Sequence, residues 1–529
     1  MKSHSIIISL IVIVLAYSFA EAKYSGGTGE PNDPYQIAEA NDLLDLSGTA
    51  TDYDKCFILT ADVNLEGQVF TTAIIAMDTS SDAYFQGTAF TGTFDGNGYK
   101  ITNFAIDGGS NWYLGLFGQI YGSSVKNLGL ENCAVSGSGS YNVGGLVGSN
   151  SGWWGSISNC YSTGTVSGYD GVGGLVGSST AFISNCYSTG AVSGSYDVGG
   201  LVGGGSGSIN NCYSTGAVSG YWSVGGLVGG NVAIISNCYS TGVVTGGDNS
   251  GYVGGLVGIN GGNISNCYST GTVSGSFAVG DLVGYNSYGD ISNCYSTGVV
   301  SGTSRIGGLV GYNQGSSSSI INCYSTGAVS GSSDSVGGLV GYKEYGSIIN
   351  CYSTGAVTGG DNSWGLGGLV GSNDSGSISN CYSTGNVNGA PDSRYVGGLV
   401  GYKSGGSISH CYFLITSGPN NGYGTPLSDE EMKQQSSFVG WDFTNETANG
   451  TNDYWRMCVD GVDYPRLNWE SIAGDFVCPD GVNVEDLDYF LQRWLLGDCA
   501  SSNNCGGADI DGSGVVDFAD YAIFAQHWW

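Results

Sequence analysis

A five-residue sequence, Cys-Tyr-Ser-Thr-Gly, returns along much of this chain and constrains its fold more than any other feature. The second half of each copy reads Gly-Gly-Leu-Val-Gly, as in residues 144–148, 173–177 and 397–401. A fixed period is typical of architectures in which every copy is one structural unit. The cysteine of the repeat recurs every 26 to 30 residues, at Cys133, Cys160, Cys186, Cys212, Cys238, Cys267, Cys294, Cys323, Cys351, Cys381 and Cys411.

Each unit holds short runs rich in Ile and Val, separated by Gly, Ser and Asn, and none has a helical period. One unit cannot bury its apolar side chains alone, but units that each form one turn of a coil stack them into a continuous core. We therefore predict an all-β fold, a right-handed parallel β-helix, with turns about 4.8 Å apart and the Cys-marked part roughly 50 Å long. A β-propeller is the alternative, although its blades need about forty residues and longer strands.

The first residues have the pattern of a secretion signal. A polar start with Lys2 precedes an apolar run from Ile6 to Ala20 and a small-residue cleavage site that ends at Ala22. The run has about fifteen residues, fewer than the roughly twenty that a membrane-spanning helix needs. We expect residues 1–22 to be a signal peptide and the mature chain to be secreted, without a transmembrane segment.

The charge balance narrows the classes of partner. The chain has 44 acidic and 13 basic residues and a net charge of −31. An excess of negative charge repels nucleic acid and anionic membrane surfaces and attracts divalent cations. Nucleic-acid binding is therefore not expected.

The repeat units resemble the GLUG motif, named for Gly-Leu-x-Gly, which occurs in bacterial surface and secreted proteins, including some immunoglobulin-cleaving metallopeptidases. The resemblance covers about residues 115–412, and Asp281 departs from it by replacing the second glycine of one unit. Upstream, residues 33–37, 59–65 and 94–98 look like the leader that begins such solenoids. We expect N-terminal coils and a cap in residues 23–130, the GLUG-repeat solenoid in 131–415, a bridging segment in 416–472 and a separate module in 473–529.

Alternation along the repeat predicts that its Cys, Ser and Val point inward and its Tyr and Thr point outward. A flat aromatic file on the surface suits sugar rings and would form a glycan-binding face. Stacked tyrosines also stabilise neighbouring strands as cross-strand pairs, and the sequence favours this structural role without excluding the other. The predicted file comprises Tyr161, Tyr187, Tyr213, Tyr239, Tyr268, Tyr295, Tyr324, Tyr352 and Tyr382.

The cysteine file is predicted to hold buried free thiols rather than disulfides. In-register neighbours lie about 4.8 Å apart, whereas disulfide Cβ atoms are about 3.8 Å apart. Outside the file, Cys499 and Cys505 are spaced to close a small loop. Asn159 and its equivalents, which precede the cysteines, are expected to form buried ladders that satisfy backbone groups at the bends.

The last part of the chain carries two acid-rich loops, of which the better runs from residue 509 to 520. Carboxylates at positions 1, 3, 9 and 12, a hydroxyl at position 5, glycine at position 6 and a carbonyl at position 7 form the oxygen cage that Ca²⁺ requires. The predicted ligands are Asp509, Asp511, Ser513, Val515, Asp517 and Asp520. A helix is expected to follow, with a stripe formed by Phe518, Tyr521, Ala522, Ala525 and Trp528.

The other loop, from residue 475 to 486, is a degenerate version of the same pattern. Its candidate ligands are Asp475, Asp480, Asn483 and Asp486, and its glycine is displaced by one position. The helix predicted after it carries Leu487, Phe490, Leu491, Trp494 and Leu495 on one stripe. Two loop-helix units within residues 473–529 resemble a dockerin, the module by which secreted bacterial proteins dock onto cohesin domains. The resemblance implies Ca²⁺ as cofactor and a cohesin-type protein as partner.

Catalytic residues are scarce in the sequence. Its three histidines are His4, His410 and His527, and it has no His-Glu-x-x-His motif and no recognisable nucleophile setting. We therefore expect a secreted, non-catalytic adhesion or scaffold protein that presents its solenoid to a glycan or a surface. The alternative is a polysaccharide-degrading lyase or hydrolase that uses carboxylates in the solenoid groove.

Overall fold

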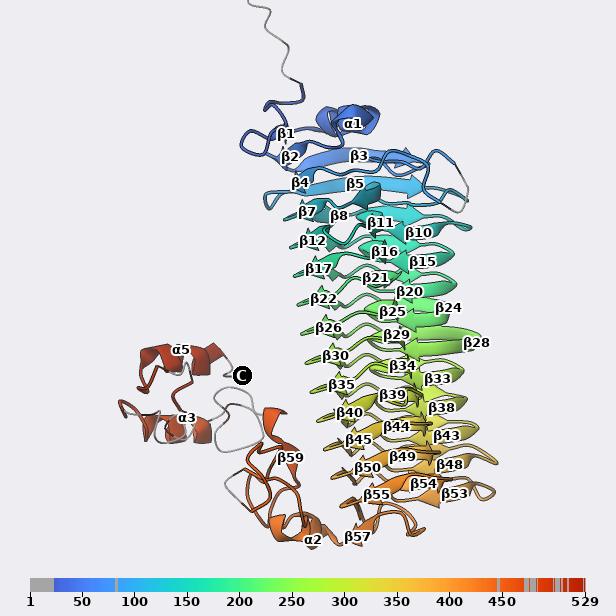
Figure 1. Cartoon of the computed structure of the whole chain (residues 1–529), viewed down its shortest axis with the longest axis vertical. Helices are drawn as coiled ribbons and strands as arrows, with labels where there is room; N and C mark the ends of the chain where they lie inside the picture. Colours follow the sequence, from blue (N-terminus) through green and yellow to red (C-terminus); the bar gives the residue numbers. More distant parts are fainter. Residues whose placement is uncertain are drawn as a thin grey trace, which may run out of the picture.

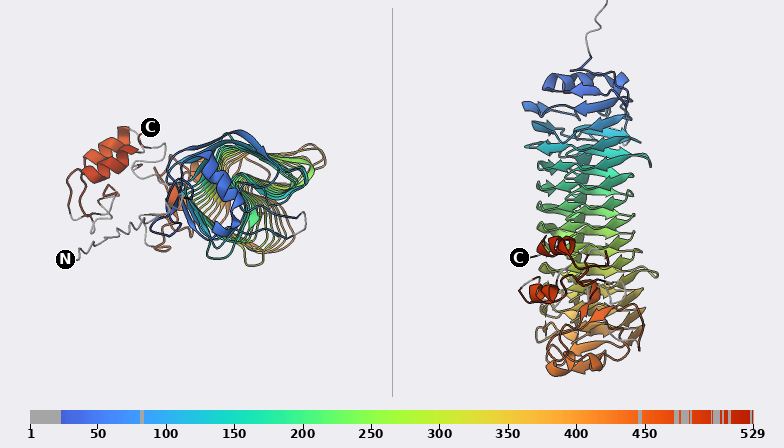
Figure 2. Two further views of the ribbon diagram at one scale, coloured as in Figure 1. Left: turned by 90° about the horizontal axis from the view of Figure 1, so that it is seen from above. Right: turned by 90° about the vertical axis from the view of Figure 1, so that its left-hand side faces the viewer.

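A computed structural model of the chain shows a long, straight column of stacked turns (Figures 1 and 2). It describes residues 23–80, 84–444, 448–470, 475, 482, 484–497, 499, 505, 508–510, 513–526 and 528. The predicted signal peptide, residues 1–22, lies outside the described residues. The GLUG-repeat region forms a parallel β-solenoid, as predicted; its right-handed winding stays a prediction.

One unit shows how a turn is built. Glycine and serine corners separate five short strands because glycine, without a Cβ atom, allows sharp changes of direction. The strands follow the sequence alternation, so Val176, Ile183 and Val192 are all buried. The strands of this turn are β15 (Asp170–Gly173), β16 (Val176–Ser179), β17 (Phe182–Ser184), β18 (Tyr187–Ser188) and β19 (Val192–Ser193).

Successive turns pair in parallel, mostly with the same residue of each repeat in register; the register shifts between β24 (Val218–Gly225) and β28 (Val244–Gly254). Val147 pairs with Val176 and Val176 with Val202, and Tyr161 pairs with Tyr187. Within the described residues this pairing forms one sheet of 14 strands, one of 11 and a set of 32 short strands. Because equivalent residues of successive turns lie one above another, each position of the repeat forms a file of residues along the solenoid (Figure 1).

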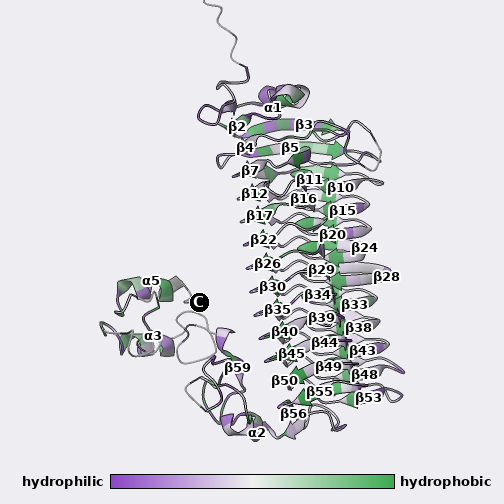
Figure 3. Cartoon of the chain, in the orientation of Figure 1, coloured by the Kyte–Doolittle hydropathy of each residue, from purple (hydrophilic) through white to green (hydrophobic). Residues whose placement is uncertain are grey.

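The interior is a continuous apolar core that runs the length of the column. Leucine, valine, isoleucine and cysteine files fill it, and members such as Leu227, Ile264 and Cys294 are at most 1% exposed. Figure 3 shows the hydrophobic residues gathered on the strands and the hydrophilic ones at the turns. The cysteines of the repeat are buried free thiols, which agrees with the prediction.

The second glycine of Gly-Gly-Leu-Val-Gly is fixed by a contact between turns. The inward serine of a neighbouring turn lies directly over it. A Cβ atom at Gly200 would lie 2.2 Å from the Ser214 hydroxyl oxygen and 2.1 Å from the carbonyl oxygen of Gly226. At Gly200 the stacking of turns therefore leaves no room for a side chain. At the same position of another unit stands Asp281, whose carboxylate accepts a hydrogen bond from the inward Ser269.

The asparagines that precede the cysteines form a ladder, but not a buried one. Asn159 is exposed and, like its equivalents, adopts a left-handed backbone conformation, with φ 53°. Its side-chain amide donates to the Asn127 oxygen at 3.0 Å. The prediction of burial was wrong for Asn159 and most of its equivalents, because asparagine is here the corner residue, which tolerates positive φ and points outward. It holds for Asn350, which is 3% exposed.

A different asparagine file is buried, two residues after the last glycine of Leu-Val-Gly. Asn231 donates to Asn260, Asn260 to Asn286, and Asn286 to Asn313, over 2.8 to 2.9 Å. Each amide also satisfies a buried backbone carbonyl or hydroxyl at the corner. This buried file therefore satisfies polar groups at the corners inside the solenoid, which is the role predicted for Asn159 and its equivalents.

The N-terminal strands belong to the same sheets as the repeats. Strands β1 (Tyr35–Ile37), β2 (Cys56–Leu59) and β4 (Thr93–Asp95) pair in order and lead to β7 (Ser124–Lys126). Helix α1 (Ala40–Gly48) lies across this end of the coil, and its Leu43 and Leu46 are fully buried (Figure 2). An apolar helix face thereby covers core side chains that have no further turn to pack against.

The bridging segment follows β56 (Tyr412–Leu414) and includes β57 (Thr425–Leu427), which pairs with β56. It contains α2 (Asp429–Met432) and a two-stranded antiparallel pair, β58 (Trp455–Arg456) and β59 (Arg466–Leu467). Further on, α3 (Val484–Leu491) and α5 (Phe518–Gln526) are short helices. Within the described residues, no helix combines the length and apolarity needed to cross a membrane.

Candidate functional site

The tyrosine file predicted from the repeat is a stack of parallel rings. From Tyr161 to Tyr382 neighbouring ring centroids lie 4.8 to 5.1 Å apart, with interplanar angles of 1 to 9°. In such a stack both faces of every interior ring contact another ring. Only ring edges and hydroxyl groups are left for a ligand. Burial raises the pKa of Tyr268 to about 12, so its phenol stays neutral at physiological pH.

The C-terminal end of this tyrosine ladder is covered by the chain itself. The Tyr352 hydroxyl donates to Glu470 at 2.8 Å, and the Tyr382 hydroxyl donates to the Pro465 carbonyl at 2.7 Å. Trp469 stacks on Tyr324 with a centroid distance of 5.8 Å. Tyr352 and Tyr382 are 2% and 1% exposed.

The prediction of an outward, exposed tyrosine was therefore wrong for Tyr352 and Tyr382. The bridging segment, read from the sequence as a connection, folds back onto the ladder and buries these rings against Trp441 and Trp455. Apolar area removed from water on both sides stabilises this contact. From Tyr161 to Tyr324 the file is half-buried, and a role in ligand binding stays a prediction there.

A second aromatic file, missed in the sequence, follows the corner that leads into Val-Gly-Gly. In this file, which we call the outer aromatic file, neighbouring centroids lie 4.2 to 6.5 Å apart and the angles between paired rings range from 35 to 79°. Its strands, β15, β20 (Tyr196–Gly199) and β24 (Val218–Gly225), lie one above another (Figure 1). The file comprises Trp112, Tyr141, Tyr169, Tyr196, Tyr221, Trp222 and Tyr252.

The signal for this file was present but irregular. An aromatic residue stands two to three residues before the valine in Tyr141-Asn-Val, Tyr169-Asp-Gly-Val and Tyr196-Asp-Val. Variable corner lengths shift it relative to the cysteine, so a comparison by fixed spacing hides it. Strand register aligns Tyr141, Tyr196 and Trp222 between turns, and Asp170, next to Tyr169, takes the same position in its turn.

Further along the solenoid the same face holds a cation of the chain itself. The Arg305 guanidinium carbon lies 4.7, 4.4 and 4.6 Å from the ring centroids of Phe277, Tyr312 and Tyr342. The hydroxyls of Tyr312 and Tyr342 donate to Glu344 and Asp374, respectively. Cation–π attraction and nearby carboxylates stabilise this cage.

Two carboxyl groups lie beside the outer aromatic file. Burial raises the pKa of Asp170, with a further contribution from the charge of Asp197, and burial raises the pKa of Asp197, although the nearby Ser223 hydroxyl acts to lower it. No ion pair to either group is found within the described residues. The backbone of Gly204 and Gly230 lies next to Asp197, so small residues form the surface below its carboxylate.

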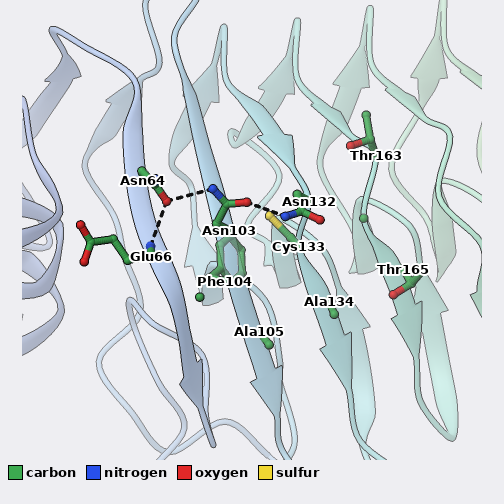
Figure 4. A pocket seen from close by; sticks show the side chains of 12 residues that line it. Asn64, Glu66, Asn103, Phe104, Ala105, Asn132, Cys133, Ala134, Thr163 and Thr165 are labelled. Atoms are coloured by element: carbon green, nitrogen blue, oxygen red, sulfur yellow. Dashed lines mark hydrogen bonds between the residues drawn. The ribbon is translucent and has the colours of Figure 1, made fainter.

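A shallow open hollow of about 570 Å³ lies near the N-terminal end of the solenoid (Figure 4). A row of amides crosses it: Asn103 donates to Asn64 at 3.0 Å, and Asn132 donates to Asn103 at 2.5 Å. Glu66 is the carboxylate among its lining residues. Paired carboxylates, which glycoside hydrolysis uses, are not part of this lining.

The repeat region encloses the ionisable side chains of Asp281 and Lys343. Burial raises the pKa of Asp281 to about 7, while Ser269 and the backbone of Gly298 donate hydrogen bonds to its carboxylate. Burial lowers the pKa of Lys343 to about 8, and its ammonium group donates to Asn373 at 3.0 Å. Both side chains are 0% exposed and belong to the interior rather than to a binding surface.

The loop predicted to bind Ca²⁺ is partly described. Asp509 is buried, one oxygen accepts the Gly514 N–H at 2.9 Å, and its other oxygen is buried without a hydrogen-bond partner. Asp520 is buried and accepts from the backbone of Ile510 and Asp517. An unsatisfied buried carboxylate oxygen at position 1 of the loop fits a cation ligand.

Other parts of the predicted calcium site are less complete. Ser513 donates to the Val515 carbonyl at 3.2 Å, and Asp517 accepts from Ala519. Asp511, Asp480 and Asn483 lie outside the described residues, whereas Asp475 and Asp486 are buried. Within the described residues no cluster of three or more His, Cys, Asp or Glu side chains converges on one point. Calcium binding therefore stays a prediction.

Helices form after both acidic loops, but their buried faces differ from the predicted stripes. In α5 the buried side chains are Phe524 and Asp520, whereas Phe518 is 78% exposed. After α3, Leu495 is exposed, and Phe490 is the buried member of its stripe. The helices are too short for the full stripes, because α3 ends at residue 491. The predicted disulfide between Cys499 and Cys505 is present.

Repeats of this sequence on parallel sheets define the class: a β-solenoid built from GLUG-motif repeats. Seven segments match the family model described as the GLUG motif: residues 139–167, 220–245, 249–274, 275–301, 302–330, 332–358 and 362–388. The other segments of the solenoid have the same strands and register.

One curated relative is Halomucin of Haloquadratum walsbyi, which is 37% identical over 164 residues. The match covers 29% of this chain but only 2% of halomucin, so the chain spans a small fraction of that protein. Among solved structures, a Bacteroides ovatus chain described as a candidate immunoglobulin A1 protease is 24% identical, with a TM-score of 0.38. That match covers 53% of this chain and 80% of the other.

Proposed function

We propose that this protein is a secreted, non-catalytic adhesion or scaffold component that presents its solenoid at a cell surface. The observation that carries the proposal is the uninterrupted stack of equivalent turns, which repeats the same outward residues along one axis. A repetitive surface binds a repetitive ligand at several places at once, so weak single contacts add up to strong attachment. The similarity to part of halomucin supports an extracellular location.

The C-terminal module is proposed to attach the protein to a partner in a calcium-dependent way. Asp509, Asp520 and the Val515 carbonyl, together with Asp511, Ser513 and Asp517, would hold the ion. Asp475, Asp480, Asn483 and Asp486 would form a weaker second site. Bound Ca²⁺ would neutralise the carboxylates and order the loops, as hard oxygen ligands do in general. A cohesin-type protein is the proposed partner.

The competing proposal is a polysaccharide-degrading enzyme that works in a groove of the solenoid. It needs two carboxyl groups placed on either side of a glycosidic bond, or a base beside an acidic sugar. Asp170 and Asp197, whose carboxyl pKa values are raised, are the nearest candidates. The sequence offers few basic residues in the repeats, and we therefore favour binding over catalysis.

Two measurements on the secreted protein test the proposal. Binding to envelope and secreted material of the producing cells is measured by pull-down with Ca²⁺ or with chelator, and retention is expected to fall on chelation. Incubation with a panel of polysaccharides is expected to release no new reducing ends or unsaturated products. Product release that is abolished by Asp197→Asn would contradict a purely binding role.

The calcium assignment has its own test. Titration of the full chain with Ca²⁺ is expected to change the intrinsic fluorescence of Trp494 and Trp528, and Asp509→Asn is expected to weaken binding at least tenfold. Asp248→Asn, which removes an exposed carboxylate from a solenoid loop, is the matched control and should bind as the parent does. A titration without any response would show that the loops fold without metal.

A further inference from the structure

We propose that the outer aromatic file between Tyr169 and Trp222, rather than the tyrosine ladder, binds an uncharged polysaccharide that lies along the solenoid axis. The inference rests on the proposed adhesive function and names its ligand class and binding face. It depends on the geometry of the rings, on their polar neighbours and on the charge of the chain.

Ring geometry separates the two aromatic files. A pyranose stacks its C–H groups on the face of an aromatic ring, so a binding ring needs an exposed face. The interior rings of the tyrosine ladder have both faces covered, because neighbours such as Tyr187 and Tyr213 are parallel within 3° and 4.8 Å apart. Tyr169 and Tyr196 meet at 66° and Tyr196 and Tyr221 at 79°, so neighbours do not cover whole faces.

Exposure agrees with this geometry. Tyr169, Tyr196, Tyr221 and Trp222 are 36, 37, 40 and 36% exposed, so more than a third of each aromatic residue is open to solvent. Four such rings on three consecutive turns form a continuous apolar strip on the surface. Strips of this kind on soluble proteins mark interaction sites more often than chance exposure does.

Polar groups beside the strip match the hydroxyls of a sugar. Asp170 and Asp197, which are partly exposed, supply carboxylate oxygens that accept hydrogen bonds. The glycines at positions 204 and 230 keep the surface next to Asp197 low enough for a ligand to approach. Binding sites for neutral ligands combine apolar surface with a few placed polar groups in this way.

The electrostatics exclude the charged alternatives. A chain with a net charge of −31, and carboxylates on this very strip, repels sulfated and uronic polysaccharides and nucleic acids. The negative charge of the chain attracts cations in general. The cation that this face does hold, Arg305, is bound by a different arrangement of rings. Three rings surround Arg305, whereas the rings from Tyr169 to Trp222 follow one another along the axis and enclose nothing.

The strip favours a polymer over a single sugar. Its rings belong to turns that are stacked in register about 4.8 Å apart, so a chain of sugars that follows the axis meets one ring after another. Each sugar then contributes a weak contact, and the linked sugars bind with a high effective concentration. A monosaccharide is expected to bind too weakly to compete.

The test is affinity electrophoresis of the full-length protein in native gels that contain glucomannan, xyloglucan or laminarin. We expect the parent protein to be retarded in at least one of these neutral polymers. The affinity derived from the retardation should be at least tenfold weaker for Trp222→Ala. It should also be weaker for the isosteric Asp197→Asn. Trp154→Ala removes a side chain that is 92% exposed elsewhere on the solenoid and should bind as the parent does. Circular dichroism and melting confirm that each variant is folded.

Several outcomes would overturn the inference. They are the absence of retardation in all neutral polymers, equal retardation of the Trp222 and Trp154 variants, and binding only to polygalacturonate or to poly-arginine. The proposed function is judged separately by the pull-down from envelope material. If that pull-down succeeds and Trp222→Ala does not affect it, adhesion stands and this binding face is wrong.

Discussion

At the scale of single residues, the residue types of the repeat are explained by contacts between turns rather than by contacts within one turn. The second glycine of most Gly-Gly-Leu-Val-Gly segments is small because a serine from another turn occupies the space above it, as Ser214 does over Gly200; over Gly398 this group is Phe413. The inward serine, the paired glycines and the buried cysteine thus form one packed layer that is copied along the axis. Close packing of this kind leaves no volume for an added methyl group.

Gly200→Ala is therefore expected to destabilise the protein. Its Cβ atom would lie 2.2 Å from the Ser214 oxygen and 2.1 Å from a carbonyl oxygen, and overpacking in a tight core costs about 1–3 kcal/mol or more. The melting temperature measures the loss. Gly204→Ala in the same turn is the control, because its Cβ atom would meet nothing closer than 3.6 Å. Equal melting of both variants would contradict the packing explanation.

Asp281 is expected to make stability depend on pH. Its pKa is raised by burial from 3.8 to about 7, so the native state holds the proton more tightly than the unfolded chain. This contribution is complete below about pH 4 and is lost as the pH rises through 7. Asp281→Gly removes this penalty. It should therefore raise the free energy of unfolding, relative to the parent, more at pH 8 than at pH 4, by on the order of 3 kcal/mol.

Thermal or chemical unfolding at pH 4.5 and pH 8 measures this difference. Asp248→Asn, which removes an exposed carboxylate, should leave the pH dependence of the parent unchanged. If Asp281→Gly keeps the parent's slope between these two pH values, the carboxylate is charged in the native protein and a different group causes the slope.

At the scale of elements, one file of side chains has different surroundings along its length. The tyrosine ladder is open from Tyr161 to Tyr268 and closed at Tyr352 and Tyr382, where the bridging segment contributes Trp441, Trp455 and Trp469. The ladder is therefore part of a second core at its C-terminal end. Its hydroxyls find acceptors there, which removes the cost of burying them.

Trp469→Ala is expected to loosen the bridging segment without unfolding the solenoid. The indole stacks on Tyr324 and donates to the Asn322 carbonyl at 3.0 Å, and its loss removes apolar contact and a hydrogen bond worth about 2–4 kcal/mol together. Hydrogen exchange in residues 455–470 should accelerate, while exchange in the repeats stays slow. Trp154→Ala is the control; acceleration there as well would mean a global effect.

At the scale of the whole molecule, stability is shared between neighbouring turns. Each turn contacts the turns before and after it, and the apolar core continues through them without a boundary. Such a molecule behaves as a one-dimensional array, in which the number of turns sets length and stability while the fold is preserved.

Deletion of one complete unit, residues 187–212, is therefore expected to be tolerated. It joins Cys186 to Tyr213, so every file keeps its register, and the column shortens by about 4.8 Å. Small-angle scattering and circular dichroism measure the length and the strand content. Deletion of half a unit, residues 187–199, is the control and should abolish folding because it places apolar residues on the wrong face. Equal behaviour of the two deletions would contradict the array description.

The solenoid itself could be predicted from the sequence. A 26- to 30-residue period fixes one turn per unit, and the alternation in Cys-Tyr-Ser-Thr-Gly fixes which side chains point inward, because both depend on local backbone geometry. The buried thiols, the stacked tyrosines and the short disulfide between Cys499 and Cys505 follow from the same local spacing.

Only the tertiary structure decided which surfaces are available. Coverage of Tyr352 and Tyr382 depends on a segment more than fifty residues downstream, and the outer aromatic file depends on corners of unequal length that align only when the turns stack. The buried asparagine file and the exposed asparagine corners differ by backbone conformation, not by residue type. The sequence of the repeat thus determined how one turn folds. The packing of turns on one another, and of the bridging segment on the tyrosine ladder, determined which side chains are available to a ligand.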